Sequence, residues 1–328
     1  MSVKAGALRF NTDSLKLELY DGNQWVEIVA SSPEAQTGGT RGVFGGGYQA
    51  PTAANNTIDY ITISTTGNAI DFGDLSVRRY YVASCSSTTR GIWGGGQLAP
   101  ESNTIDYVTI SSTGNASDFG DLTQARVGPA CCSSSTRGVF GGGLNPTRLN
   151  TIDYITIASI GNAVDFGDLT FTGAYSSSLS SSTRGLFAGS ATPTRINTID
   201  FVTIASTGNA SDFGDLTVVN AYSCGVSNST RGLFGGGSTP SLVNVISFIT
   251  IATLGNAQDF GDLINPTTSS AGCSSPTRGV FGGGYVTPTE TNVIQYVTIL
   301  TTGNAIDFGD LTVRRTNAAG LSNGHGGL

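Results

Sequence analysis

The chain has 328 residues, a net charge of −7 and only 12% charged residues. Nucleic-acid binding needs clustered Lys and Arg to neutralise phosphates, so 16 basic against 23 acidic residues exclude nucleic acid as a partner. No stretch approaches the roughly 20 apolar residues that cross a bilayer, and residues 1–6 lack the apolar core of a secretory signal. We therefore expect a soluble protein made in the cytoplasm, without membrane insertion.

Residues 1–30 are the first predicted unit. Two turn clusters, Asn11-Thr-Asp-Ser and Asp21-Gly-Asn-Gln, separate short alternating strands. We predict a small β-hairpin module here. Residues 31–39, which are rich in Ser, Pro and Gly, are a predicted linker.

The strands of this module have a specific order of residues: Gly-x-Leu-Arg-Phe-Asn-Thr, then Leu-Glu-Leu-Tyr-Asp-Gly, then Trp-Val-Glu-Ile. The order, over about 23 residues, resembles a module common in tail fibres and other virion proteins of bacteriophages. The resemblance implies attachment or oligomerisation, with other virion proteins and further copies of this chain as partners and a trimer among the possible assemblies. The residues that would carry this role are Leu8, Phe10, Tyr20 and Trp25.

Residues 40–328 form the second predicted unit and repeat one phrase six times. The copies open at Arg41, Arg90, Arg137, Arg184, Arg231 and Arg278, a spacing of 49 residues and then 47 four times. Each copy holds a short strand that ends in glycines, a hairpin such as residues 57–75, and a strand of small residues such as 80–86. Four antiparallel strands per period and no helix signal predict an all-β, six-bladed β-propeller of four-stranded blades.

The apolar strand, the double glycine and the hairpin together resemble the kelch repeat. Kelch blades usually carry a Tyr and a Trp close together, whereas here Tyr60 is followed by Phe72, so we describe the blades as kelch-like. The family's arrangement implies that the small residues around Ala83 to Ser87 line the axis. The first copy lacks a preceding strand of this kind and residues 314–324 follow the last copy, so we predict that the C-terminal strand completes the first blade beside residues 41–46 and closes the ring.

Neither cysteine nor acidic residues predict a metal or redox site. Cys85, Cys132 and Cys273 occupy a position where other copies carry Leu179 and Val226, which indicates a small apolar core site. The repeated pair exemplified by Asp71 and Asp74 allows a calcium site, but ion pairs with the repeated arginines and turn hydrogen bonds are the interpretation we favour. We predict no metal and no cofactor.

The sequence also argues against an enzyme. The only histidine is His325, at the position of the repeated arginine, so neither a triad nor a His-ligated metal can be assembled from it. A carboxylate pair for glycoside hydrolysis would belong to one blade, whereas these aspartates recur in all six.

The copies differ mainly after the glycine run and after the hairpin. Because strands alternate in direction, these two connections emerge on one face, and loops on a rigid scaffold are where binding usually sits. Drift in unconstrained loops is the alternative explanation. The candidate binding residues on this face are Tyr48, Gln49, Arg78, Arg79, Tyr80, Gln97, Arg126, Arg148, Tyr175, Arg195, Tyr222, Tyr285, Glu290, Arg314 and Arg315.

The predicted function is therefore that of a non-enzymatic structural protein of a phage virion. It would be a tail fibre, a receptor-binding protein or a capsid decoration, whose propeller face binds a host surface glycan or protein. Two alternatives stay open: a lectin-like carbohydrate-binding propeller outside a virion, and a metal-stabilised adhesin.

Overall fold

The computed structural model describes residues 4, 6–11, 16–27, 40–51, 53–98, 100–191 and 193–328. The chain divides into two compact units, Met1–Gly39 and Thr40–Leu328. The described residues form strands and no helix, which confirms the all-β prediction. The boundary coincides with the predicted start of the second unit at residue 40, and the predicted linker lies outside the described residues.

The N-terminal unit is a three-stranded antiparallel sheet of β1 (Leu8–Asn11), β2 (Lys16–Tyr20) and β3 (Trp25–Glu27). It therefore has one strand more than the predicted hairpin. The turn from β2 to β3 is held by the Asp21 carboxylate, which accepts hydrogen bonds from the backbone N–H groups of Asn23 and Gln24. A short Asp side chain favours such a turn because it replaces the missing backbone partner.

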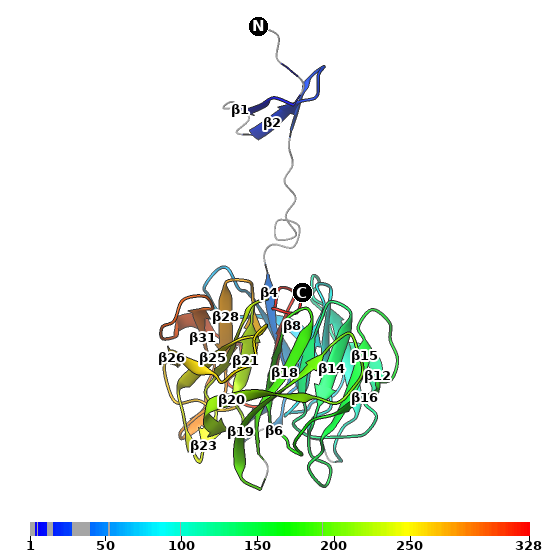
Figure 1. Cartoon of the computed structure of the whole chain (residues 1–328), viewed down its shortest axis with the longest axis vertical. Coiled ribbons are helices and arrows are strands. Elements are labelled where there is room, and N and C mark those ends of the chain that lie inside the picture. The colour runs from blue at the N-terminus through cyan, green and yellow to red at the C-terminus, as the bar shows by residue number, and fades with distance from the viewer. Residues whose placement is uncertain are drawn as a thin grey trace. The chain divides into compact units, whose positions relative to one another are not determined.

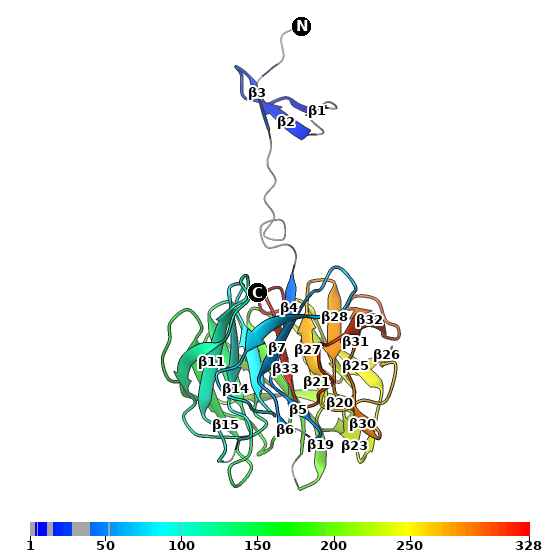
Figure 2. The same ribbon diagram turned by 180° about the vertical axis from the view of Figure 1, so that it is seen from behind.

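The described part of the second unit contains six four-stranded antiparallel sheets, standing side by side in Figures 1 and 2. The first strands are β33 (Ala319–Ser322), β9 (Ala83–Ser86), β13 (Ala130–Ser133), β17 (Ser177–Ser180), β21 (Cys224–Ser227) and β27 (Ala271–Ser274). The second strands are β4 (Arg41–Gly45), β10 (Arg90–Gly94), β14 (Arg137–Gly141), β18 (Arg184–Ala191), β22 (Arg231–Gly235) and β28 (Arg278–Gly282).

The third strands are β7 (Thr57–Thr62), β11 (Thr104–Thr109), β15 (Thr151–Thr156), β19 (Arg195–Thr203), β25 (Val245–Thr250) and β31 (Val293–Thr298). The fourth strands are β8 (Ile70–Asp74), β12 (Ser117–Asp121), β16 (Val164–Asp168), β20 (Ser211–Asn220), β26 (Gln258–Asp262) and β32 (Ile306–Asp310). Small hairpins follow three of the second strands: β5 (Tyr48–Gln49) with β6 (Ala53–Ala54), β23 (Ser238–Thr239) with β24 (Ser241–Leu242), and β29 (Tyr285–Val286) with β30 (Thr289–Glu290).

The last strand of the chain belongs to the same sheet as the first strand of the second unit. β33 pairs with β4, with Ser322 opposite Gly42 and Ala319 opposite Gly45. The predicted pairing of residues 314–324 beside residues 41–46 is therefore present. One predicted strand is shorter than expected: β9 begins at Ala83 rather than at residue 80, because Tyr81 has a φ of 54° and this left-handed conformation interrupts an extended strand.

The hydrophobic core lies between neighbouring sheets. In one cluster Val43, Ile58 and Phe72 of the sheet that contains β4 pack against Trp93 and Val108 of the next sheet. Five equivalent clusters fill the other junctions. The predicted core aromatics are at most 3% exposed: Phe44, Trp93, Phe140, Phe187, Phe234 and Phe281.

These rings explain the glycine that five of the six second strands carry after the core aromatic, where the fourth has Ala188. A Cβ on Gly45 would lie 2.8 Å from the Trp93 ring, and one on Gly141 would lie 2.8 Å from the Phe187 ring. Such distances are shorter than carbon atoms tolerate, so the close packing of neighbouring sheets requires glycine.

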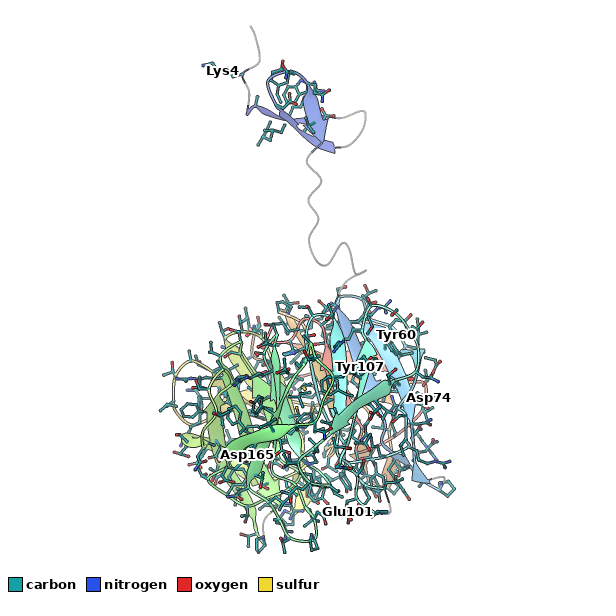
Figure 3. The ribbon with its side chains drawn as sticks, turned by 90° about the vertical axis from the view of Figure 1, so that its right-hand side faces the viewer. Lys4, Tyr60, Asp74, Glu101, Tyr107 and Asp165 are labelled. Carbon is teal, nitrogen blue, oxygen red and sulfur yellow. The ribbon has the colours of Figure 1, made fainter. Side chains whose placement is uncertain are left out.

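The repeated arginines join neighbouring sheets in a way that the sequence did not indicate. Arg41 lies 4.8 Å from the centroid of the Tyr60 ring and donates a hydrogen bond to the Ile110 carbonyl of the next sheet. The other five arginines repeat both contacts. Figure 3 shows Tyr60 and Tyr107 at corresponding places in adjacent sheets.

The favoured ion pairs between these arginines and the Asp71 and Asp74 positions are therefore wrong. Asp71 is exposed, and no ion pair in the described part of the chain involves either aspartate. The contact seen here uses the backbone and not the carboxylates: the backbone N–H of Asp74 donates to the Asn115 side chain of the neighbouring sheet.

Candidate functional site

The variable connections lie together on one face. The segments after the second strands form β-bridges with the segments that lead into the first strands, for example Tyr48 with Thr316 and Tyr80 with Gln97. The small hairpins around β6 and β23 accordingly lie at one end of this unit, at the bottom of Figures 1 and 2, with the C-terminus at the other end. This agrees with the prediction that sequence variation gathers on one side.

A circular series of hydrogen bonds marks the centre of this face. The backbone N–H of each residue donates to the carbonyl of its counterpart in the preceding copy at 2.8–3.1 Å, and the series returns to its start. All six members have left-handed φ angles of 54–62°, and they are Tyr81, Gly128, Tyr175, Tyr222, Ser269 and Asn317. The conformation turns the chain from the connection into the first strand.

Tyrosine side chains gather over this series. The ring centroids of Tyr175 and Tyr222 are 4.6 Å apart and stacked, and Tyr81 lies 4.7 Å from Tyr175. Tyr80 continues the cluster at 5.2 Å from Tyr81, and Tyr48 at 5.4 Å from Tyr80. We call these five residues the tyrosine mouth.

Two hollows adjoin the tyrosine mouth. One has a volume of about 140 Å³ and runs between the first strands, where Ser84, Cys131 and Gly225 are among the small lining residues. The other, of about 360 Å³, lies between the mouth residues, Tyr285 and Glu290. Its volume falls within the range of roughly 300–1,000 Å³ typical of ligand pockets.

Burial keeps three of the mouth tyrosines neutral at physiological pH: Tyr81, Tyr175 and Tyr222. Burial, together with the neighbouring tyrosines, raises the pKa of Tyr81, and burial raises the pKa of Tyr175 to about 12. Burial also raises the pKa of Tyr222, although the nearby Arg195 and Arg148 oppose the shift. The phenol groups of the mouth therefore offer hydroxyls that can donate as well as accept hydrogen bonds.

Three arginines predicted for the binding face are instead buried between the sheets. Arg79, Arg126 and Arg315 are 0% exposed, and they form ion pairs with Asp106, Asp153 and Asp59. The prediction that they contact a ligand is wrong, because the side chains point inward from the connection.

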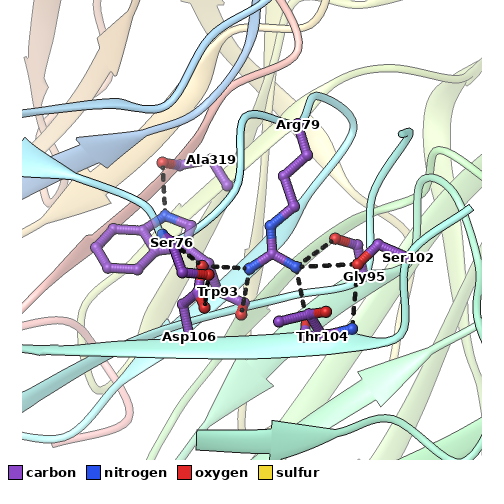
Figure 4. Close-up of polar contacts among 8 residues, drawn as sticks. All are labelled: Ser76, Arg79, Trp93, Gly95, Ser102, Thr104, Asp106 and Ala319. Carbon is purple, nitrogen blue, oxygen red and sulfur yellow. Dashed lines mark hydrogen bonds and ion pairs between the residues drawn. The ribbon is translucent and has the colours of Figure 1, made fainter. Parts of the chain in front are cut away.

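The Arg79 environment shows why such an arginine is structural. Its guanidinium lies 2.9 Å from the Asp106 carboxylate and donates to the backbone carbonyls of Trp93, Gly95 and Thr104 (Figure 4). Burial lowers the pKa of Arg79, and the Asp106 carboxylate opposes that shift. The guanidinium thereby joins three backbone segments of one sheet.

The remaining predicted residues divide into two groups. Tyr285 and Glu290 line the larger hollow beside the mouth, and Gln97 is half-buried on the bridge to Tyr80. Gln49 is half-buried within β5, and Arg78 and Arg314 are exposed, with Arg78 lining a separate outer hollow. The structure therefore does not bring Arg78 into the mouth.

Sequence reasoning missed Tyr81, which is central to the mouth. The signal was present, because the six copies align Tyr81 with Tyr175 and Tyr222, whereas Tyr80 aligns with small or β-branched residues such as Ala174 and Ala221.

The opposite end of the first strands is closed by a second circular series. The hydroxyl of each serine donates to the carbonyl of its counterpart at 2.5–2.9 Å, through Ser86, Ser133, Ser180, Ser227, Ser274 and Ser322. His325 lies against this ring with its Nε2 3.1 Å from the Ser86 carbonyl, and Gly326 N–H donates to Ser227. Burial lowers the pKa of His325 to about 4, so the buried ring is neutral.

The cysteines and acidic residues form no evident reactive centre. All five cysteines are buried free thiols. The described residues contain no group of three or more His, Cys, Asp or Glu side chains arranged to hold a metal ion.

In the N-terminal sheet, the predicted attachment residues Tyr20 and Trp25 are in ring contact at 5.3 Å. Arg9 lies over the Trp25 ring at 4.2 Å and pairs with Glu18. Leu8 is 60% exposed, and the side chain of Phe10 lies outside the described residues. The register places Leu8 on the same face as Leu19 and Val26, and the cluster of Tyr20 and Trp25 on the opposite face.

No family model matches the chain, and a search of the curated proteins finds no relative. Within the part of the chain that the structure describes, no helix has the length and apolar character needed to span a membrane.

Proposed function

We propose that this chain is a non-enzymatic structural protein of a bacteriophage virion, as a tail fibre, receptor-binding or capsid-decorating component. Its second unit would present the tyrosine mouth to a host surface, and its N-terminal unit would attach it to other virion proteins. The resemblance of residues 6–28 to virion modules supports the second part, together with the exposed apolar face that Leu8 shares with Leu19 and Val26.

We infer that residues 40–328 form a six-bladed, kelch-like propeller that the C-terminal strand closes. The pairing of β33 with β4 supports this, as do the series of arginine, serine and backbone hydrogen bonds that return to their starting sheets. Closing the ring gives every sheet two packed neighbours and leaves only short strand edges. In each sheet an edge-to-face ring pair such as Tyr60 with Phe72 takes the place of the Tyr and Trp of kelch blades.

The tyrosine mouth is the single observation that carries the proposed binding role. At the positions of Tyr81, Tyr175 and Tyr222 the other copies have Gly128, Ser269 and Asn317, so the backbone series forms without an aromatic side chain. The fold therefore does not require these rings. Clustered, partly buried tyrosines on a rigid scaffold are characteristic of recognition surfaces.

Two measurements test the proposal. Antibodies against residues 40–328 should label purified phage particles in electron micrographs, and the purified chain should bind host cells. The double variant Tyr175→Ala, Tyr222→Ala should lose cell binding by at least tenfold while keeping its melting temperature within a few degrees. Phage particles that the antibodies do not label would refute the virion assignment. Unchanged cell binding by the folded double variant would refute the binding role of the tyrosine mouth.

A lectin-like propeller outside a virion is the second candidate, and the same tyrosine mouth favours it. Glycan binding without labelling of particles would support this alternative. Labelled particles would support the virion assignment.

A further inference from the structure

We propose that the tyrosine mouth binds a saccharide whose terminal ring bears a carboxylate, with Arg148 and Arg195 as the groups that recognise the anion. The inference rests on the proposed function of the mouth as a binding site, and it names the class of ligand.

Arg148 belongs to the same copy as Tyr175. Its Nε donates to the Ala191 carbonyl, and Ala191 forms a β-bridge with Ala174, the residue immediately before Tyr175. Arg148 is exposed, and its charge acts on both Tyr175 and Tyr222. The Arg148 side chain is therefore held at the bridge that leads into Tyr175.

Arg195 takes the corresponding place one copy later. Its Nη2 donates to the Ser238 hydroxyl at 3.1 Å, and Ser238 forms a β-bridge with Ala221, the residue immediately before Tyr222. Ser238 also lines the larger hollow beside the mouth. In each of these two copies, the arginine side chain thus bonds a residue of the bridge that leads into the tyrosine of that copy.

Neither arginine has an acidic partner. Arg79, Arg126 and Arg315 form ion pairs, but no ion pair among the described residues involves Arg148 or Arg195. Neither guanidinium lines the larger hollow itself, but Arg195 reaches its wall through Ser238. In a chain with a net charge of −7, arginines without an acidic partner at this edge favour an anionic ligand. Arginine binds carboxylates well because its planar fork can form two parallel hydrogen bonds.

Two buried polar atoms in the wall of the larger hollow have no hydrogen-bond partner in the described structure. They are Thr316 Oγ1 and Asn317 Oδ1. The other unpartnered buried atoms are arginine Nε atoms, including those of the ion-paired Arg79, Arg126 and Arg315. Buried polar groups are normally paired, so a donor and acceptors left open here point to a ligand with both kinds of group. Sugar hydroxyls supply both.

The remaining surface of the hollow fits a sugar ring. Tyr48, Tyr81, Tyr222 and Tyr285 supply aromatic faces and phenol groups around about 360 Å³. A sugar ring offers apolar C–H faces to such rings and hydroxyls to the phenols. Glu290, which is 8% exposed, lies on the same wall as Tyr285 and accepts a hydrogen bond from the Thr289 hydroxyl. An anionic group would therefore orient toward the arginines and not toward Glu290.

Calorimetric titration of the full chain tests the proposal. The probes are oligosaccharides that end in a hexuronate or a nonulosonate, each compared with its counterpart in which the carboxyl group is reduced to an alcohol. We expect at least one acidic probe to bind tenfold or more tightly than its reduced form, with an affinity that falls as salt rises. Arg148→Gln and Arg195→Gln should each weaken that binding by about tenfold, as expected for a lost charge-assisted contact.

Arg78→Gln is the matched control, since it removes the same charge from an exposed arginine outside the mouth, and it should leave binding within twofold. Equal affinity for acidic and reduced probes, insensitive to Arg148→Gln and Arg195→Gln, would overturn the inference while leaving a tyrosine-dependent binding role intact. Absence of binding by every acidic probe also overturns it. Failure of the proposed function itself would appear separately, as host-cell binding that does not depend on Tyr175 and Tyr222.

Discussion

One position of the repeat offers a test in which the same substitution should have different effects in two sheets. Asp153 and Asp200 are counterparts, and both are 0% exposed. Asp153 pairs with the buried Arg126. In the next copy Gly173 takes the place of that arginine, so Asp200 has only Thr170, whose backbone N–H and hydroxyl both donate to it at 2.7 Å.

Asp153→Ser should destabilise the protein by about 3–5 kcal/mol, because it leaves the Arg126 guanidinium buried without its anion. Asp200→Ser should change stability by no more than about 1 kcal/mol at pH 7, because it removes a buried carboxylate whose pKa burial raises. Serine is native to this position in a later copy, where Ser247 retains the hydrogen bond with the hydroxyl of Thr217 at 2.6 Å.

The assay is equilibrium unfolding in guanidinium chloride at pH 7 and at pH 4. A raised carboxyl pKa means that the folded state holds its proton to higher pH than the unfolded state, so the penalty from Asp200 is present above the folded pKa and disappears as pH falls through the unfolded pKa. The change in the free energy of unfolding caused by Asp200→Ser should therefore be more favourable at pH 7 than at pH 4. Equal losses of several kcal/mol from both substitutions would refute the role assigned to Arg126.

Three further predictions concern packing, protonation and metal. Gly141→Ala should lower the free energy of unfolding by about 1–3 kcal/mol in a denaturant titration, because its Cβ would lie 2.8 Å from the Phe187 ring. Ala188→Gly, at the counterpart position, is the control and should lower it less. A larger loss from Ala188→Gly than from Gly141→Ala would contradict the packing argument. The lowered pKa of His325 means that its buried neutral form contributes stability above the unfolded pKa of about 6.5, which is lost as pH falls toward 4. His325→Gln should therefore reduce the difference in the free energy of unfolding between pH 7 and pH 4 by up to about 3 kcal/mol. If the variant and the unsubstituted protein lose the same stability over this range, the role assigned to His325 is wrong. Excess chelator should leave the melting temperature unchanged, whereas a clear drop would favour the metal-stabilised adhesin.

Much of the architecture could be predicted from the sequence, because a repeat must reuse the same contacts. The period of Arg41 and its counterparts, the glycines after the core aromatics and the alternation in residues 57–62 define four strands per copy. The unpaired C-terminal segment predicted the partner of β4. Variation between the copies indicated which face carries the connections, since only surface connections are free to differ.

The tertiary structure alone decided which residues of that face are accessible. Arg79 and Arg148 both belong to variable segments, yet the first is buried against Asp106 and the second is exposed beside Tyr175. The position of an arginine within a connecting segment of the sequence does not determine whether its side chain points between two sheets or outward. The left-handed turn at Tyr81 is likewise set by the hydrogen bonds between copies, because contacts between sheets determine a backbone conformation that local sequence does not favour.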